Sequence, residues 1–326
     1  MEVYETIDKS VMKFIHDDGS ETAIKTVPGC VEFQNPLTNK KEKLKDRNKY
    51  VVFISSSVGC PVKCKFCYLT LKNYPFEKLS YLEIVKNLKE AISDAVERNP
   101  ELKKKYIKLS FMGMGDILFD MWNFQNIIVK VLLWVFENKY AIGLDGVDIA
   151  TVFPIKSATK RLELMTAVSR MNDHLKCFMH NPSNIKRSFI RLFYSLHTTE
   201  TDLRNELIPV NSGKDIIYDI MFLKRLKEFA KIDIIFHYMF MSGINDDWED
   251  VYSLIDFINN NRLNDFEFRI LKYNECNLSK IKAVPENNMK EILKVLNEHV
   301  NILKVQHSAG SEIKSACGQF IMKVGN

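Results

Sequence analysis

The sequence predicts an α/β fold whose parallel strands curl into a partial (β/α)6, TIM-like barrel, with a small N-terminal β extension and a C-terminal tail. Six β-rich apolar runs alternate with segments of helical periodicity between residues 50 and 305, and such alternation builds a parallel sheet. Three cysteines directly follow the first run, where the carboxyl ends of barrel strands hold ligands. A flat, doubly wound sheet would show the same alternation and stays the alternative.

Composition and charge limit the class of protein. The 326 residues are enough for a substantial core, and a net charge of +5 does not by itself establish nucleic-acid binding. No apolar run is long enough to span a bilayer, and the first five residues lack the basic and apolar regions of a signal peptide. Seven cysteines, an odd number, argue against a disulfide framework and for a reducing compartment. We therefore expect a cytoplasmic protein with no membrane partner.

The first 49 residues read as a β extension followed by a basic loop. Apolar residues alternate loosely around a turn signal made by Asp17, Asp18, Gly19 and Ser20. Positive residues then crowd one short segment, at Lys40, Lys41, Lys43, Lys45, Arg47 and Lys49. Such a run is typical of a solvated loop, and contact with phosphates is the alternative. We expect the barrel to occupy residues 50–305 and the tail residues 306–326.

Strands and helices then alternate along the chain. Strands are predicted at residues 50–55, 107–112, 147–152, 189–196, 232–241 and 266–271. One helix begins at a capping box formed by Ser80 and Glu83, and others are predicted at residues 124–136, 157–171, 216–230, 248–258 and 288–300. Residues 172–186 read as an inserted surface loop. Metal binding there by Cys177 with His174 and His180 is the less favoured interpretation.

The cysteine loop carries the strongest chemical signal. Cys60, Cys64 and Cys67 are separated by three and then two residues, so a short loop can point all three sulfurs at one iron–sulfur cluster. Three ligands are one fewer than a four-iron cluster needs, which leaves one iron open for a small molecule. The alternatives are a structural zinc site or plain core cysteines. Zinc usually takes four protein ligands, and no second paired motif follows.

This spacing, with Phe66 directly before the last cysteine, resembles that of the radical S-adenosylmethionine (SAM) superfamily. The resemblance implies that Cys60, Cys64 and Cys67 bind a [4Fe-4S] cluster and that the amino and carboxyl groups of SAM chelate its fourth iron. It also implies cleavage of SAM to a 5′-deoxyadenosyl radical, with the electron supplied by a reductant such as flavodoxin or ferredoxin. The cofactor then carries the difficult chemistry and the protein positions it.

A glycine-rich turn follows the second strand and contains Gly113, Gly115 and Asp116. By the same resemblance, its backbone and the Asp116 carboxylate hold the amino group of SAM. A tight turn between a strand and a helix would also need glycine and stays the alternative.

A narrower resemblance rests on six motifs that occur in one order along the chain. They are Ser55-Ser56-Ser57-Val58-Gly59-Cys60, Phe111-Met112-Gly113-Met114-Gly115, Ser195-Leu196-His197, Pro209-Val210-Asn211, Gly243-Ile244-Asn245-Asp246 and Ser315-Ala316-Cys317-Gly318-Gln319. Together they look like the RlmN and Cfr family of radical SAM methyltransferases, which methylate an adenine in RNA. The resemblance implies an RNA substrate and no DNA partner. It also implies that Cys317 carries the methyl group and that Ser195 and Asn274 contact SAM.

The chain departs from that family at three places. The family has a second catalytic cysteine seven residues before the first cluster ligand, and here that position holds Phe53, which cannot accept a proton. Ala150-Thr151-Val152-Phe153 replaces a serine-rich motif, and we expect the N-terminal RNA-binding accessory domain to be missing. The leading hypothesis is RNA adenine methylation or a modification derived from it. Hydrogen abstraction from a peptide, nucleotide or small metabolite is the second hypothesis, and a non-catalytic metal protein that binds nucleic acid is the third.

Overall fold

The parallel strands of the sheet follow one another in chain order. The computed structural model describes residues 1–34, 41–45, 47–178, 188–211, 213–306 and 313. Neighbouring parallel strands run in the order β6 (Lys49–Ile54), β9 (Tyr106–Phe111), β10 (Gly143–Thr151), β11 (Ile190–Ser195), β12 (Asp233–Ser242), β13 (Glu267–Lys272) and β15 (Ile302–Gln306). A doubly wound sheet requires the strand order to reverse, and this order does not. The predicted partial barrel is therefore confirmed and the flat alternative is wrong.

The six predicted strands are all present, and β15 adds a seventh parallel strand beside β13. In the sequence, residues 302–305 are a short apolar run after which the alternating pattern ends. The run instead completes one more helix–strand unit after α8 (Glu286–Asn297). Among the described residues β15 and β6 do not pair, because β15 has β13 as its one neighbour there and antiparallel strands follow β6 on the other side. The barrel is consequently incomplete.

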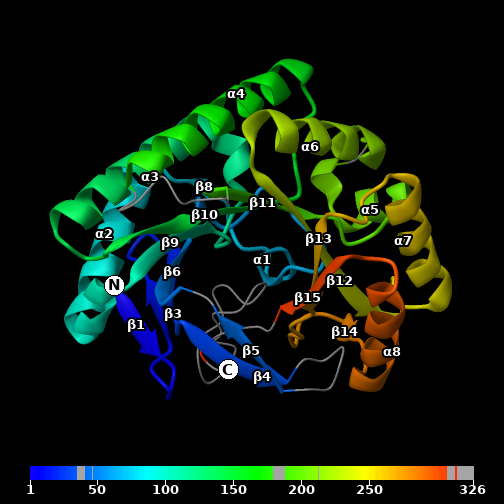
Figure 1. Cartoon of the computed structure of the whole chain (residues 1–326), viewed down its shortest axis with the longest axis horizontal. Helices are drawn as coiled ribbons and strands as arrows, with labels where there is room; N and C mark the ends of the chain where they lie inside the picture. Colours follow the sequence, from blue (N-terminus) through cyan, green and yellow to red (C-terminus); the bar gives the residue numbers. More distant parts are fainter. Residues whose placement is uncertain (35–40, 46, 179–187, 212, 307–312, 314–326) are drawn as a thin grey trace.

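Helices form an outer arc around the parallel strands (Figure 1). The main ones are α2 (Tyr81–Arg98), α3 (Met121–Glu137), α4 (Ala158–Leu175), α6 (Ile216–Ala230), α7 (Trp248–Asn260) and α8. The predicted capping box is confirmed, since the Ser80 hydroxyl accepts from the Glu83 backbone N–H and the Glu83 carboxylate accepts from that of Ser80. Ile84, Leu88 and Ala91 form part of the stripe that α2 buries against the sheet. The apolar core thus lies between the helices and the outer face of the barrel.

The prediction of an inserted loop from residue 172 is wrong at its beginning. Helix α4 continues to Leu175, and the short helix η3 (Lys176–Phe178) follows it. Asn172 is buried and joins three elements: its amide donates to the carbonyls of Ala230 and Lys231, and its oxygen accepts from the Phe189 backbone N–H. A polar side chain at this position therefore supports the helix instead of ending it. Residues 179–187, including His180, lie outside the described part of the chain.

The N-terminal strands extend the barrel sheet. β1 (Glu2–Glu5), β2 (Val11–Ile15) and β3 (Glu21–Val27) are antiparallel, and β3 pairs with β6. The predicted turn between β2 and β3 is confirmed: Gly19 has a φ of +84°, which favours glycine, and the backbone N–H of His16 donates to the Ser20 carbonyl. A separate antiparallel hairpin, β4 (Cys30–Gln34) with β5 (Lys41–Lys45), comes next. The expected basic loop is therefore wrong for residues 41–45, which form a strand.

Buried ion pairs fill the barrel near the beginning of its strands. The Nζ atoms of Lys49 and Lys108 each lie 3.2 Å from Asp145 Oδ2, and Arg191 donates to both carboxylate oxygens of Asp148 at 2.8 and 2.6 Å. Burial lowers the Lys108 pKa, which its acidic neighbours oppose. Lys49, the last member of the predicted basic run, is thus a buried structural residue, and this part of the phosphate-binding alternative is wrong.

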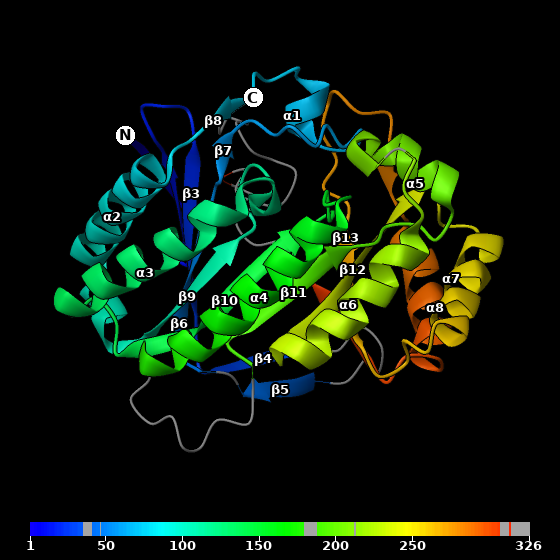
Figure 2. The ribbon, with the colours of Figure 1, turned by 90° about the horizontal axis from the view of Figure 1, so that it is seen from above.

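The two ends of the barrel differ in what they carry. Figure 2 shows the short helix α1 (Tyr68–Leu71) and the β7–β8 ribbon at one end of the sheet and the β4–β5 hairpin at the other. Since α1 follows the cysteine loop, the hairpin lies far from that loop. No helix in the described ranges is long and apolar enough to cross a membrane.

Candidate functional site

The cysteine loop leaves the C-terminal end of β6 and returns through a small ribbon. β7 (Ser57–Val58) pairs with β8 (Glu77–Lys78), and α1 begins directly after Cys67. Inside the loop the Cys67 backbone N–H donates to the Cys64 carbonyl at 3.1 Å, and Lys63 takes a left-handed φ of +57°. These turns fold the chain back on itself, so Cys60, Cys64 and Cys67 face a common region at the barrel mouth.

The thiols lie close enough to influence one another. Burial raises the pKa of Cys60 to about 11, although backbone hydrogen bonds from Val62, Gly115 and Lys63 oppose the rise. Burial raises the pKa of Cys64 well above its ordinary value, and the neighbouring Cys67 and Cys60 add to this. Without a cation the site therefore favours neutral thiols. A bound metal centre reverses that preference, and backbone N–H groups already point at the sulfur of Cys60.

This arrangement fits a cluster better than a single ion. Across the described ranges no set of three or more His, Cys, Asp and Glu side chains surrounds one metal position. A four-iron cluster attaches each thiolate to a different iron, so its ligands surround a volume instead of one point. Both Cys60 and Cys67 lie close enough to influence Cys64, and backbone N–H groups bond to Cys60, which is compatible with that requirement. Cys60, Cys64 and Cys67 remain the predicted ligand set.

An apolar shell encloses the loop from the barrel side. Cys60, Cys64 and Phe66 pack against a buried cluster contributed by the loop, by the end of the helix at Thr201–Leu207 and by the ends of several strands: Val62, Val152, Leu207, Ile208, Met239, Met241 and Tyr273. The Phe66 ring also meets His197 edge-on, with centroids 5.3 Å apart. Such a shell limits access of water and thereby tunes the reduction potential of a cluster.

The glycine-rich turn after β9 is fastened to the chain that enters the cysteine loop. Gly113 N–H donates to the Ile54 carbonyl, Met114 N–H donates to the Ser55 hydroxyl, and Ser56 N–H donates to the Met114 carbonyl, at 3.0, 3.0 and 2.8 Å. A Cβ on Gly113 would lie 2.6 Å from the backbone of Ile54 and Ser55. The absence of a side chain is required by this close approach alone.

Gly115 is restricted in the same way. Its φ is +88°, and a Cβ there would lie 2.4 Å from the hydroxyl oxygens of Ser56 and Ser57. The tight turn, which was the alternative interpretation, is therefore enough by itself to explain both glycines. Contact of this turn with SAM stays a prediction that is compatible with it.

Asp116 ties the glycine-rich turn to the end of β10. Its Oδ2 accepts from the Thr151 hydroxyl at 2.8 Å and from the Val152 N–H at 3.0 Å, while Oδ1 accepts from the Leu118 N–H at 3.0 Å. Burial raises the Asp116 pKa to about 6, and these three hydrogen bonds oppose the rise. The carboxylate therefore has a positioning role whether or not it also meets the amino group of SAM. Thr151 belongs to the segment that replaces the family's serine-rich motif.

The other predicted SAM contacts lie at strand ends on the same edge of the sheet. Ser195 is the last residue of β11, and Asn274 follows β13 after the buried Tyr273. Both side chains are half-buried. His197 is buried, with a left-handed φ of +59°, and burial lowers its pKa to about 3. The topology therefore brings Ser195 and Asn274 to the edge that carries the cysteine loop, but their contact with SAM stays a prediction.

Arg204, which no motif in the sequence indicated, lies in α5 (Thr201–Leu207). Its guanidinium is buried and donates to the carbonyls of Ser195, Leu196 and Val152, so it holds the ends of β10 and β11 together. Its positive charge also opposes the rise in the Cys64 pKa. The Pro209-Val210-Asn211 motif, which the sequence did indicate, lies beside Arg204: the Asn211 amide donates to the same Val152 carbonyl at 3.0 Å.

The remaining cysteines occupy different places. Cys317 lies outside the described residues, and only the backbone of Cys30, at the beginning of β4, is placed. Cys177 is exposed in η3, which follows α4 at the end of the barrel opposite the cysteine loop. Cys276 is half-buried in the loop after β13, and both it and Cys67 influence the pKa of Tyr273. Cys276 is therefore the described thiol outside the cluster motif that comes nearest to the site.

The chain is similar in sequence to curated proteins named RNA methyltransferases. No family model matches the chain. A curated protein named dual-specificity RNA methyltransferase RlmN, from Wolinella succinogenes, is 26% identical over 330 residues, covering 98% of this chain and 82% of that protein. The chain is similar to RlmN along nearly its whole length. The RlmN protein of Wigglesworthia glossinidia brevipalpis is also 26% identical, over 283 residues that cover 86% of this chain and 66% of the relative.

The fold of solved structures agrees with this relationship. A crystal structure of a radical SAM methyltransferase from Sphaerobacter thermophilus matches with a TM-score of 0.69 at 19% identity, covering 98% of this chain and 80% of that one. At this identity the match shows the fold. The resemblance to RlmN inferred from scattered motifs and the barrel inferred from strand alternation are both confirmed.

Proposed function

We propose that this protein is a radical SAM enzyme of the RlmN type, which methylates an adenine in RNA or carries out a modification derived from that reaction. The observation that supports it most is the similarity to RlmN over 98% of the chain. The cysteine loop at the C-terminal end of β6 adds to it, because barrel enzymes carry out their chemistry at that edge. A cytoplasmic location is part of the proposal.

Cys60, Cys64 and Cys67 would hold the [4Fe-4S] cluster. When bound, the cluster supplies the electron, received from a reductant such as flavodoxin or ferredoxin, that cleaves SAM to a 5′-deoxyadenosyl radical. The chain's own residues do the rest: the apolar shell around Phe66 keeps water out, and the turn at Gly113 and Gly115 offers its backbone to SAM. Asp116, Ser195 and Asn274 are the proposed side-chain contacts of SAM.

Cys317 is the proposed methyl carrier, by its match to the family's Ala-Cys-Gly-Gln motif. Phe53 favours a second candidate function, hydrogen abstraction from a peptide, nucleotide or small metabolite without methyl transfer. Phe53 lies on β6 between Ala23 of β3 and Ser110 of β9, and no ionisable group replaces it in that register. If methyl transfer takes place, the proton must leave through another group, and Cys276 is the described thiol best placed to take it.

Methyl-labelled SAM separates these candidates. The protein is reconstituted with iron and sulfide under anaerobic conditions, reduced, and incubated with labelled SAM and an unmodified large-subunit ribosomal RNA transcript. Mass spectrometry of protein and RNA digests should find the label on Cys317 and on adenine, together with free 5′-deoxyadenosine. Label on neither, with 5′-deoxyadenosine still formed, favours hydrogen abstraction. No 5′-deoxyadenosine at all contradicts both candidates.

The ligand set has its own test. Cys60→Ala should lose the visible absorbance of the cluster and its bound iron, because two thiolates cannot replace three. Cys177→Ala is the matched control, since Cys177 is exposed at the opposite end of the barrel. Iron retention by Cys60→Ala equal to that of the control would rule out the proposed ligands.

A further inference from the structure

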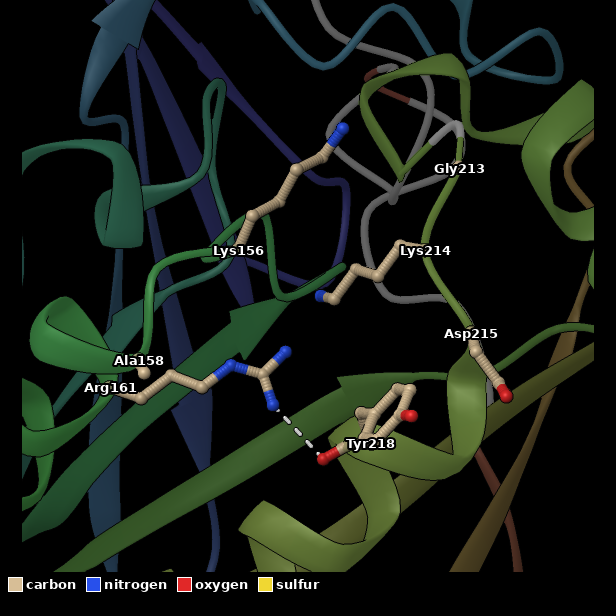
Figure 3. Close-up of a pocket in the computed structure, with 7 residues that line it drawn as sticks. All are labelled: Lys156, Ala158, Arg161, Gly213, Lys214, Asp215 and Tyr218. Atoms are coloured by element: carbon tan, nitrogen blue, oxygen red, sulfur yellow. Dashed lines mark hydrogen bonds between the residues drawn. The ribbon is translucent and has the colours of Figure 1, made fainter.

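A cationic pocket lies beside the candidate site, between the N-terminal ends of α4 and α6. Its volume is about 420 Å³, and it is lined by Lys156, Ala158, Arg161, Gly213, Lys214, Asp215 and Tyr218 (Figure 3). None of the residues that line the pocket has a role in the proposed SAM chemistry. It lies at the C-terminal ends of β10 and β11, on the same edge as the cysteine loop.

Positive charge dominates the pocket. Arg161 and Lys214 approach the single buried carboxylate of Asp219 at 2.6 and 2.7 Å, and Lys156 is exposed at the rim. The Asp215 carboxylate caps α6, where it accepts a hydrogen bond from the Ile217 N–H. Three cations thus face two carboxylates, and the N-terminal ends of two long helices add about half a positive charge each. The pocket favours an anion.

Two of the three cations, Arg161 and Lys214, are held in place before any ligand arrives. The Arg161 guanidinium donates to the carbonyls of Ile155 and Tyr218, the latter at 3.0 Å, and stacks over the Phe153 ring at 5.2 Å. The Lys214 side chain is 6% exposed, and its ammonium group donates to the Phe153 carbonyl. Because little side-chain freedom remains to be lost, binding an anion here costs little ordering entropy.

The pocket also shares backbone with the candidate SAM site. The Phe153 carbonyl accepts from Lys214, and the Phe153 ring lies under the Arg161 guanidinium. Phe153 directly follows Thr151 and Val152, which both donate hydrogen bonds to Asp116. At the pocket's outer edge the Tyr218 side chain is 65% exposed. An exposed aromatic ring beside fixed cations is the arrangement by which proteins bind single-stranded nucleic acid, with phosphate on the cations and a base on the ring.

The geometry points to this pocket as the site that holds a backbone phosphate of the RNA substrate next to the target nucleotide, with the adjoining base stacked on Tyr218. The inference rests on the proposed RNA substrate and specifies where the strand is bound. A free nucleotide phosphate has the same chemistry, so the experiment includes adenosine monophosphate and inorganic phosphate as separate probes.

The test uses Lys156→Ala and Tyr218→Ala in the reconstituted full-length protein, with Lys160→Ala as the matched control. Lys160 is exposed in the first turn of α4 but does not line the pocket. Binding of a fluorescent single-stranded RNA oligonucleotide is measured at several salt concentrations. We expect Lys156→Ala to weaken binding about fivefold and to reduce the slope of log K against log[salt] by roughly 0.7, the value for one phosphate contact on a single strand. Tyr218→Ala should weaken binding at least about fivefold with an unchanged slope.

Two further measurements separate this inference from the proposed function. Cluster content and RNA-independent cleavage of SAM should equal those of wild type in all three variants, so a failure of SAM chemistry would be visible independently of RNA binding. RNA binding by Lys156→Ala and Tyr218→Ala that matches the Lys160→Ala control would overturn the assignment. Tight binding of adenosine monophosphate or inorganic phosphate that does not compete with RNA would also overturn it, in favour of a small-molecule phosphate site.

Discussion

The Thr151 hydroxyl donates a 2.8 Å hydrogen bond to the Asp116 carboxylate, and this contact joins the turn after β9 to the end of β10. Asp116 belongs to the turn that the family resemblance assigns to SAM binding, and Thr151 belongs to the segment that replaces the family's serine-rich motif. Because the bond is buried and one partner is a charged carboxylate, breaking it leaves an acceptor short of a donor. The two strand ends thus act as one support for the candidate site.

Thr151→Val keeps the shape of the side chain and removes the hydroxyl. We expect it to lower the free energy of unfolding by about 1–3 kcal/mol, the cost of an unsatisfied buried polar group, and to raise the KM for SAM. Urea unfolding and SAM cleavage kinetics measure the two effects. Thr166→Val is the control, since Thr166 is exposed on α4 and bonds within its own helix. Equal stability of the two variants would contradict the coupling.

Gly113→Ala places a methyl group 2.6 Å from the backbone of Ile54 and Ser55. Since backbone cannot move aside as a side chain can, we expect a loss of stability of about 3 kcal/mol and poorer iron retention by the adjacent cysteine loop. Gly243→Ala is the control: its φ is +73° but a Cβ there meets nothing within 4 Å. That variant should lose only about 1 kcal/mol, the cost of the left-handed conformation, and keep its iron. Full iron retention by Gly113→Ala would disprove the mechanical link.

Asp145→Asn removes the carboxylate charge that the buried Lys49 and Lys108 share, although Asp148 stays 3.7 Å from Lys108. We expect the free energy of unfolding to fall by about 3–5 kcal/mol, as is typical when one side of a buried ion pair is removed. Glu206→Gln breaks the exposed Lys65 pair and should change it by less than about 1 kcal/mol. Denaturant unfolding of both variants measures these changes. Equal losses of unfolding free energy would contradict the prediction and would mean that water reaches the ion pairs inside the barrel.

Burial lowers the His16 pKa to about 4, against an ordinary value of 6.5. The unfolded chain therefore binds the proton more readily, and stability should fall as pH decreases from about 6.5 towards 4, by up to about 3 kcal/mol from this residue. Asp17 and Asp18 attract the proton while Lys86 and the N-terminus repel it, and burial outweighs them. His16→Gln should flatten this part of the stability profile. An unchanged slope would exclude His16 as the titrating group.

Local patterns predicted much of this fold. The alternation of β-rich and helical segments located every barrel strand except β15, and the pair Ser80 and Glu83 located the beginning of α2. The cysteine loop was also found, because its chemistry depends on spacing within eight consecutive residues. Each of these features is encoded by neighbours in the chain.

Features that depend on distant partners were not predicted. Lys49 looked like part of a solvated basic run because its partner, Asp145, comes from another strand. Asp116 looked available for a ligand because Thr151, which occupies it, lies 35 residues away. The cationic pocket forms only where the beginnings of two separate helices bring Lys156 and Lys214 to one place, which periodicity does not reveal.

The pairing of β3 with β6 has a consequence for how firmly the cysteine loop is supported. Six residue pairs join these strands, from Thr22 opposite Ile54 to Val27 opposite Lys49, so the outer edge of β6 has no hydrogen-bonding groups left for β15. Closing the cylinder would require that ladder to break. β6 is therefore held by a ladder on each of its edges, and the cysteine loop starts from a strand that cannot shift without breaking one of them.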